Sequence, residues 1–264
     1  MKDLKSKVSV IMPAYNETFR IASSIEEVAS TMEEFGCLWE IIVVDDGSTD
    51  DTLACAEALT HKYPGQLVAK RNTENYGKGR AIKKALHYAT GEYIVFLDAD
   101  LDLNPVQMQT LFDIMRLDNA DVVIASKHHP NSVVFYPWHR KVVSWVYYQL
   151  VKLLFGLPCR DTQTGLKLFK AEVLRKVLPC ILVKKFAFDV EVLINAHRLG
   201  FKITDAPIVM SPEKKYGWVT PRAVLTTLWD TLAVFYRLFI LKYYDRIDYH
   251  RRKNLAKEFR RMRK

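Results

Sequence analysis

The feature that most constrains the fold is a regular alternation of short apolar runs with longer segments of helical periodicity. The short runs, which we interpret as strands, cover residues 8–13, 40–46, 66–71, 92–98 and 121–126. The helical segments between them cover 17–35, 50–62, 78–89 and 105–117. The last of these has a clear start, because Asn104 is a favourable N-cap and Pro105 suits the first helical position. Strands joined by helices predict βαβ units, and therefore an α/β fold with a mostly parallel sheet flanked by helices.

Length and charge narrow the classes of partner. The chain has 264 residues, 49% of them hydrophobic, which is enough for one large domain or two small ones. Its formal charge of +9 favours anionic partners, whether nucleic acid, a membrane surface or phosphorylated substrates. The apolar run before Pro13 is too short for a signal peptide or an anchor. Four scattered cysteines, without metal-ligand spacing, are typical of reduced core residues in a cytosolic protein.

Acidic residues follow three of the predicted strands. Strand 8–13 runs into "PAYNE", strand 40–46 ends in Asp45 and Asp46, and strand 92–98 continues into "DADLD", with carboxylates at alternating positions. In such sheets, ligands bind at the carboxyl ends of the strands. No GxGxxG follows the first strand, so the dinucleotide fingerprint is absent. Carboxylates hold hard divalent cations that bind diphosphates, and they accept hydrogen bonds from base and ribose. A merely acidic loop is the alternative.

Six segments resemble, in order, the motifs of family 2 glycosyltransferases with the GT-A (nucleotide-diphospho-sugar transferase) fold. These segments are VSVIMPAYNE, IIVVDDGSTDDT, NYGKGRAIKKAL, YIVFLDADL, DTQTGLKLF and FDVEVL. The chain is most similar to the branch that makes polyprenyl-phosphate sugars. "RDTQTGLKLF" and "FAFDVEVL" resemble the dolichyl-phosphate glucosyltransferases more than the mannose synthases. The resemblance covers roughly residues 7–220, which we therefore expect to form the GT-A domain.

The resemblance implies a site for a nucleotide sugar and a divalent cation. The residues that it assigns to the nucleotide sugar are Pro13, Tyr15, Glu17, Asp45, Asp46, Lys78, Asp98 and Ala99. Asp100 would bridge Mg²⁺ or Mn²⁺ to the donor diphosphate and take part in catalysis, and Asp102 would be a second metal ligand. From the residues alone, the first of these positions also fit polar turns before helices, and Lys78 also fits a solvated lysine at a helix start.

Residues between 127 and 214 of the chain imply a site for the acceptor. The positions that match the family's contacts to an acceptor phosphate are Lys127, Arg140, Ser144 and Lys214. Lys127 stands where the family usually has arginine, so it keeps the charge but loses the bidentate fork. Asp189 and Glu191 would face the acceptor and hold sugar hydroxyls or phosphate-binding cations. Arg140 and Asp189, with Asp100, complete the expected catalytic set. An ordinary surface arginine is the alternative for Arg140.

Two segments indicate contact with a membrane. The helix expected over 136–155 has an apolar face, and so does the one expected over 221–244. Asp230 near the centre of the latter would cost about 2.5–3.5 kcal/mol on an insertion scale, so we predict an interfacial helix rather than a transmembrane one. The tail up to Lys264 is strongly basic, which suits an anionic surface. Residues 221–264 are therefore expected to form a membrane-binding part, with a buried core helix as the alternative.

These observations lead to one expected function. It is metal-dependent, inverting transfer of a hexose, with glucose from UDP-glucose as the first choice, to a polyprenyl (dolichyl or undecaprenyl) phosphate. Such a phosphate has a second pKa near 6, so it is already a nucleophile and needs no general base. We place the enzyme peripherally on the cytoplasmic face of a membrane. A membrane-protein partner or a homo-oligomer stays open.

Three alternatives stay open as well. The donor could be GDP-mannose, or the acceptor could be a glycan hydroxyl, which would require a general base. A non-enzymatic, basic domain associated with nucleic acid is the third. Neither a base-stacking platform nor a helix-turn-helix pattern supports it, so no nucleic-acid partner is expected.

Overall fold

The central element is one mixed sheet. The computed structural model describes residues 6–135, 137–183, 185, 187–210 and 221–248. The strands in this part of the chain are β1 (Val8–Ala14), β2 (Trp39–Asp45), β3 (Leu67–Arg71), β4 (Tyr93–Phe96), β5 (Val122–Ala125), β6 (Lys167–Lys170) and β7 (Ile203–Ala206). They form a seven-stranded sheet in the order β3-β2-β1-β4-β6-β5-β7. Only β6 runs antiparallel to its neighbours β4 and β5. The mostly parallel α/β sheet is thus confirmed.

The α-helices are α1 (Ile21–Phe35), α2 (Thr52–Ala58), α3 (Lys78–Ala85), α4 (Met108–Leu117), α5 (Trp138–Phe155), α6 (Ala171–Val177), α7 (Phe188–Arg198) and α8 (Pro221–Phe235). Helices α1 to α5 and α8 lie within expected helical segments, whereas α6 and α7, like the strands β6 and β7, were not predicted. The expected start of the fourth helical segment is confirmed, since the Asn104 side chain accepts a hydrogen bond from the Val106 amide at 2.9 Å. The chain there makes one 3₁₀ turn, Pro105–Gln107, before α4 begins.

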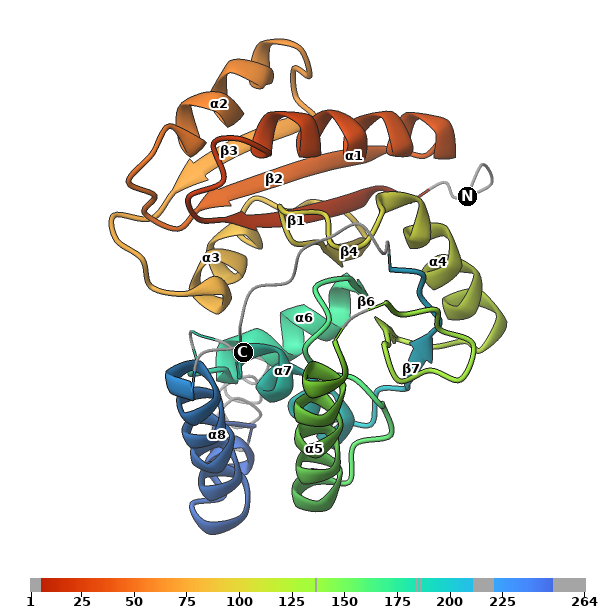
Figure 1. Cartoon of the computed structure of the whole chain (residues 1–264), viewed down its shortest axis with the longest axis vertical. Coiled ribbons are helices and arrows are strands. Elements are labelled where there is room, and N and C mark those ends of the chain that lie inside the picture. The colour runs from red at the N-terminus through yellow and green to blue at the C-terminus, as the bar shows by residue number, and fades with distance from the viewer. Residues whose placement is uncertain (1–5, 136, 184, 186, 211–220, 249–264) are drawn as a thin grey trace, which may run out of the picture.

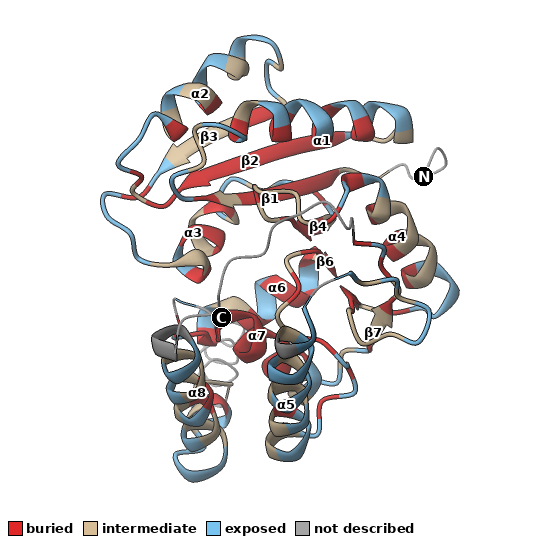
Figure 2. Cartoon of the chain, viewed as in Figure 1, coloured by how far each residue is buried: buried red, intermediate tan, exposed pale blue. Residues whose placement is uncertain are grey.

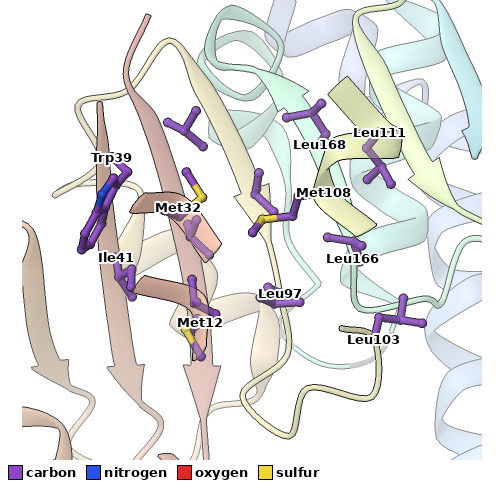
Figure 3. Close-up of a cluster of buried hydrophobic side chains, with 14 of the residues drawn as sticks. Met12, Met32, Trp39, Ile41, Leu97, Leu103, Met108, Leu111, Leu166 and Leu168 are labelled. Carbon is purple, nitrogen blue, oxygen red and sulfur yellow. The ribbon is translucent and has the colours of Figure 1, made fainter. Parts of the chain in front are cut away.

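Two hydrophobic layers enclose the sheet. Along β1, Val10 and Met12 point to one face and Ile11 points to the other, as the two-residue period of a strand requires. Helices α1 and α4 pack on the first face, and Figure 3 shows this cluster with Met12, Met32 and Met108. Helices α3, α6 and α7 cover the second face, which lies below the strands in Figure 1. The four cysteines are free, as expected.

Helices α5 and α8 lie side by side and project away from the sheet (Figure 1). Tyr147 and Thr231 join them through a hydroxyl–hydroxyl hydrogen bond of 2.9 Å. Figure 2 shows that their outward faces are mostly exposed or half-buried, although Val234 and Thr231 are buried. No helix in the described residues is both long enough and apolar enough to cross a bilayer.

The expected helix over 221–244 ends earlier than predicted. The α-helix gives way to a π-helical turn, Tyr236–Ile240, and the chain leaves the helical conformation at Lys242, which has a φ of 48°. The chain then turns back toward the core, and Tyr244 becomes fully buried. The physical reason is a polar anchor inside the protein, because the Tyr244 hydroxyl donates to the Glu191 carboxylate.

Candidate active site

The carboxyl ends of β1, β2 and β4 meet around a cavity of about 520 Å³. Most of the residues expected to bind the donor line it, namely Pro13, Tyr15, Glu17, Asp46, Lys78, Asp98, Ala99 and Asp100. The sequence analysis missed four other lining residues, Ala14, Asn75, Gly77 and Lys185. Asn75 and Gly77 belong to the "NYGKG" segment, so their position next to Lys78 was the available signal. The fold thus brings three motifs that are distant in sequence to one site.

The acidic pair after β2 has two different roles. Asp46 accepts hydrogen bonds from the side-chain amide of Asn72 and from the Gly77 amide, both at 2.7 Å, and it also reaches the cavity. Asp45 does not line the cavity. It is buried, its carboxylate accepts from the amide and hydroxyl of Ser48, and Arg71 Nε lies 3.2 Å from Oδ2. Asp46 therefore holds the loop before α3 against the site, while Asp45 shapes the turn behind it.

Lys78 and Asp98 form an ion pair in the cavity. Lys78 Nζ lies 2.6 Å from Asp98 Oδ1. Burial opposes the charge of Lys78, but Asp98, Asp189 and Asp100 outweigh it and raise the Lys78 pKa. Burial likewise opposes ionisation of Asp98, but Lys78 and then Lys167 keep its pKa below the ordinary value. Both groups are therefore charged at neutral pH, and the lysine presents a cation to any phosphate that enters.

The turn after β4 is held in an uncommon backbone conformation. Leu101 has a φ of 47°, its amide donates to the Asp98 carbonyl at 3.1 Å, and the Asp102 amide donates to Asp100 Oδ1 at 3.2 Å. Ser24 of α1 donates to the Ala99 carbonyl at 2.7 Å and fixes the turn to the core. Left-handed backbone at a non-glycine residue is strained, and such residues cluster at functional sites.

The carboxylates of this turn fit a shared metal site. Within the described ranges no three His, Cys, Asp or Glu side chains lie close enough to hold a metal by themselves. Mg²⁺ is often held by only one or two carboxylates together with substrate phosphates, which matches the oxygen donors of Asp98 and Asp100 in the cavity. Asp102 instead lines a smaller neighbouring cavity of about 100 Å³, together with Asp98 and Lys127.

A buried ion pair supports the floor of the site. Lys167 Nζ lies 2.8 Å from Asp189 Oδ1, and both side chains are almost inaccessible to solvent. Lys167 also donates to the Thr164 carbonyl. The pair joins the "DTQTGLKLF" and "FDVEVL" segments, and Asp189 is near enough to Lys78 to affect its pKa. Sequence reasoning missed Lys167, although a lysine inside the apolar run of a strand demands a buried partner.

Glu191 lies elsewhere than expected. It is fully buried, and one carboxylate oxygen accepts from the amides of Leu182 and Val183 at 3.0 and 2.7 Å. The other oxygen accepts from Tyr244 and pairs with Arg237 at 3.3 Å. In this arrangement Glu191 does not face the cavity. It ties α7 to the π-helical turn and to the segment that follows it.

The residues expected to bind an acceptor phosphate gather beside the first half of α5. Lys127 lines a cavity of about 430 Å³ together with Lys141, and its amide donates to Asp161. Ser144 forms a 2.9 Å hydrogen bond with His128 Nε2, a neighbour that the sequence analysis missed. Burial lowers the His128 pKa. Arg140 lies one turn before Ser144 on α5, and Lys214 falls outside the described residues.

The profile of glycosyl transferase family 2 matches residues 9–178, more than half of the chain. The chain belongs to glycosyltransferase family 2. The family predicted from the six motifs is thus confirmed.

Two curated relatives and one solved structure show how far this likeness extends. Dolichyl-phosphate beta-glucosyltransferase of Saccharomyces cerevisiae is 32% identical over 221 residues, covering 76% of this chain and 66% of the relative. Glycosyltransferase AglD of Haloferax volcanii is 29% identical over 209 residues, covering 78% and 33%. The chain thus spans a third to two thirds of these relatives. Glucosyl-3-phosphoglycerate synthase from Mycobacterium tuberculosis, in complex with Mn²⁺, UDP and phosphoglyceric acid, has a TM-score of 0.67 at 22% identity, covering 89% and 79%. This likeness confirms the GT-A fold.

Proposed function

We propose that the protein transfers glucose from UDP-glucose to a polyprenyl phosphate of the dolichyl type. The observation that carries the proposal is the charged cavity of Lys78, Asp98 and Asp100 beside two helices with exposed apolar faces. Relatives named dolichyl-phosphate beta-glucosyltransferase support glucose as the sugar and dolichyl phosphate as the acceptor. A neighbouring structure that contains Mn²⁺ and UDP-glucose supports the donor and a divalent cation.

The donor is held by opposite charges. Lys78 contacts the diphosphate, while Asp46 and Asp98 accept hydrogen bonds from the nucleoside, with Pro13, Tyr15 and Glu17 forming the adjoining wall. Asp100, with Asp98 or Asp102, would hold Mg²⁺ or Mn²⁺, which when bound stabilises the negative charge of the leaving nucleotide. The Lys167–Asp189 pair keeps Asp189 in place under the site.

The acceptor needs positioning more than activation. A phosphate monoester is ionised at neutral pH, so the chain must offset its repulsion from the donor diphosphate. Lys127 and Arg140 supply positive charge for this, Ser144 adds a hydrogen bond, and Lys214 is assigned the same role. Attack by a phosphate oxygen on the anomeric carbon in a single displacement inverts its configuration. A hydroxyl acceptor would require a base, for which Asp189 or Glu191 was the candidate. Asp189 is paired with Lys167, and Glu191 is bound to Arg237 and Tyr244.

An enzyme that uses a lipid-linked acceptor must work at a membrane surface. Exposed apolar side chains lie along the two projecting helices: Val142, Val143, Trp145, Val146 and Leu153 on α5, and Leu225, Trp229, Leu232, Phe239 and Ile240 on α8 and its π-helical turn. We propose that this face attaches peripherally to the cytoplasmic leaflet, aided by the basic residues 249–264, which lie outside the described part. Four free cysteines fit the cytosolic side.

The test is a transfer assay with radiolabelled UDP-glucose or GDP-mannose, with dolichyl phosphate in liposomes, and with or without divalent cation. We expect lipid-linked glucose only when UDP-glucose, lipid and cation are all present. Asp100→Ala should lower the rate by about 100-fold or more, the range for loss of one electrostatic group in an active site. Asp113→Ala, which removes a half-exposed carboxylate of α4, is the matched control. Faster transfer from GDP-mannose, or wild-type turnover of Asp100→Ala, would contradict the proposal.

A further inference from the structure

A second large cavity among the described residues lies outside the donor site. It is a cleft of about 1020 Å³ between α3 and α6, which we call the α3–α6 cleft. Both helices lie on the lower side of the sheet in Figure 1, and Ile94 of β4 forms part of its floor. None of its lining residues also lines the 520 Å³ cavity. The cleft is therefore a second, separate concave surface.

All the charged side chains that line the α3–α6 cleft are positive. Four cationic side chains line the α3–α6 cleft, Arg80, Lys83, Lys84 and Arg175, and no carboxylate of the described chain does. Lys83 and Lys84 donate to the carbonyls of Ile181 and Arg71, which are neutral acceptors. Like charges held together raise the local potential, and a concave, low-dielectric wall focuses it. The cleft therefore attracts anions.

Three of the least exposed cations elsewhere in the described chain each have a carboxylate partner. Lys78 has Asp98, Lys167 has Asp189 and Arg237 has Glu191. In contrast, no ion pair among the described residues involves Arg80, Lys84 or Arg175. Arg80 and Arg175 are exposed and lie on opposite walls, one on α3 and one on α6.

The remaining lining combines aromatic and aliphatic groups. The rings of Tyr76 and Tyr88 are partly exposed at the cleft, and Leu178, which directly follows α6, adds half-buried aliphatic surface. A planar, apolar group could pack on such walls while its phosphates meet the arginine forks. The volume is at the upper end of the range for small-molecule sites, about 300–1,000 Å³.

We propose that the α3–α6 cleft binds a phosphorylated molecule of nucleotide size, independently of the sugar donor. Two occupants from the chain itself are disfavoured by charge. The segment 249–264 is basic, and a second copy also carries a net charge of +9, so both are repelled. This inference does not depend on the proposed glucosyl transfer.

The experiment uses the full chain and ATP as the probe. Isothermal titration is carried out in EDTA and without UDP, so that the donor cavity lacks the divalent cation expected to hold a diphosphate there and the cleft has no competing nucleotide. We expect one equivalent of ATP to bind to the wild type, with affinity at least about tenfold lower in Arg80→Gln/Arg175→Gln, because two charge-assisted contacts are lost. The matched control is Arg116→Gln/Lys176→Gln, which removes the same charge from α4 and α6 outside the cleft. It should bind ATP within about twofold of the wild type.

A second arm distinguishes free phosphates from lipid headgroups. Flotation with vesicles of phosphatidylcholine and phosphatidic acid is compared between the same two double variants. Loss of vesicle binding only in the Arg80/Arg175 pair, with ATP binding unaffected, would identify a lipid phosphate as the ligand. Equal behaviour of both variants in both assays would overturn the proposal. The part of UDP binding that requires Mg²⁺ or Mn²⁺ reports on the donor cavity. It should stay at the wild-type value in all variants, so a defect at the donor site can be told apart from a loss of binding at the cleft.

Discussion

At the scale of single residues, the position of Asp98 depends on a glycine in another motif. A Cβ atom at Gly165 would lie 2.2 Å from Asp98 Oδ2 and 2.6 Å from its Cγ. Gly165→Ala should therefore displace the carboxylate and lengthen the Lys78–Asp98 contact. A displacement of about 1 Å can lower activity by about 100-fold, so we expect a loss of that order in kcat/KM. Circular dichroism should show an intact fold. Unchanged kinetics would mean that Asp98 moves aside without consequence.

A second residue makes stability depend on pH. Burial is the main cause that raises the Asp205 pKa from its ordinary value of 3.8 to about 6. The folded state therefore holds this proton more tightly than the unfolded state does. The free energy of unfolding falls as pH rises from about 4 to about 6, by at most about 3 kcal/mol. Asp205→Asn removes this fall, so its stability relative to the wild type should increase between pH 4 and pH 7. Urea denaturation at both values measures it, and a constant difference would contradict the assignment.

At the scale of elements, α7 holds the end of α8 through one carboxylate. Glu191 is the buried partner of Arg237 and Tyr244, and removing one member of a buried ion pair typically costs about 3–5 kcal/mol. Because Arg237 keeps some exposure, we expect Glu191→Gln to lower the free energy of unfolding by about 3 kcal/mol at most.

The matched control for Glu191→Gln is Glu172→Gln on α6. Glu172 forms only an exposed pair with Lys176 at 3.8 Å, so its loss should change stability by less than about 1 kcal/mol. Urea denaturation compares the two variants, and limited proteolysis reports whether the segment after α8 is released. Equal effects of the two substitutions would mean that Glu191 is not a structural anchor. They would favour instead the role first expected for Glu191, contact with the acceptor.

At the scale of the whole molecule, the projecting face of α5 and α8 should carry membrane attachment. Trp145 and Trp229 are 54% and 73% exposed, one on each helix. Replacing both by serine should reduce flotation with anionic liposomes several-fold, because stable attachment needs an apolar contribution as well as an electrostatic one.

Phe19 and Leu117 provide the control for this attachment, since they are more exposed than the two tryptophans, at 100% and 77%, but lie on the α1 and α4 side. Phe19→Ser/Leu117→Ser should float like the wild type. Binding that is lost equally in both double variants would show a general effect of surface hydrophobicity, and binding lost in neither would leave only the basic residues to explain attachment.

The sequence by itself determined the strands β1 to β5, the helices that connect them and most of the donor site, but not β6, β7, α6 or α7. Short apolar runs define buried strands, and the carboxylate motifs directly follow two of them, so the parallel topology alone brings Asp46, Asp98 and Asp100 to one edge. These are local signals, and the family motifs keep their order along the chain. Asn104 as a helix start is local in the same way.

Only the tertiary structure decided which polar residues face the cavity and which face each other. Asp189 and Lys167 lie in separate motifs, and their pairing depends on β6 running antiparallel next to β4, which no local pattern specifies. Glu191 was expected at the acceptor, but its burial depends on a chain reversal at Lys242, more than 50 residues later. The α3–α6 cleft likewise depends on helices that are distant in sequence. Such contacts are set by packing across the whole core. A charged side chain can be buried without a large free-energy cost only where another element supplies its partner.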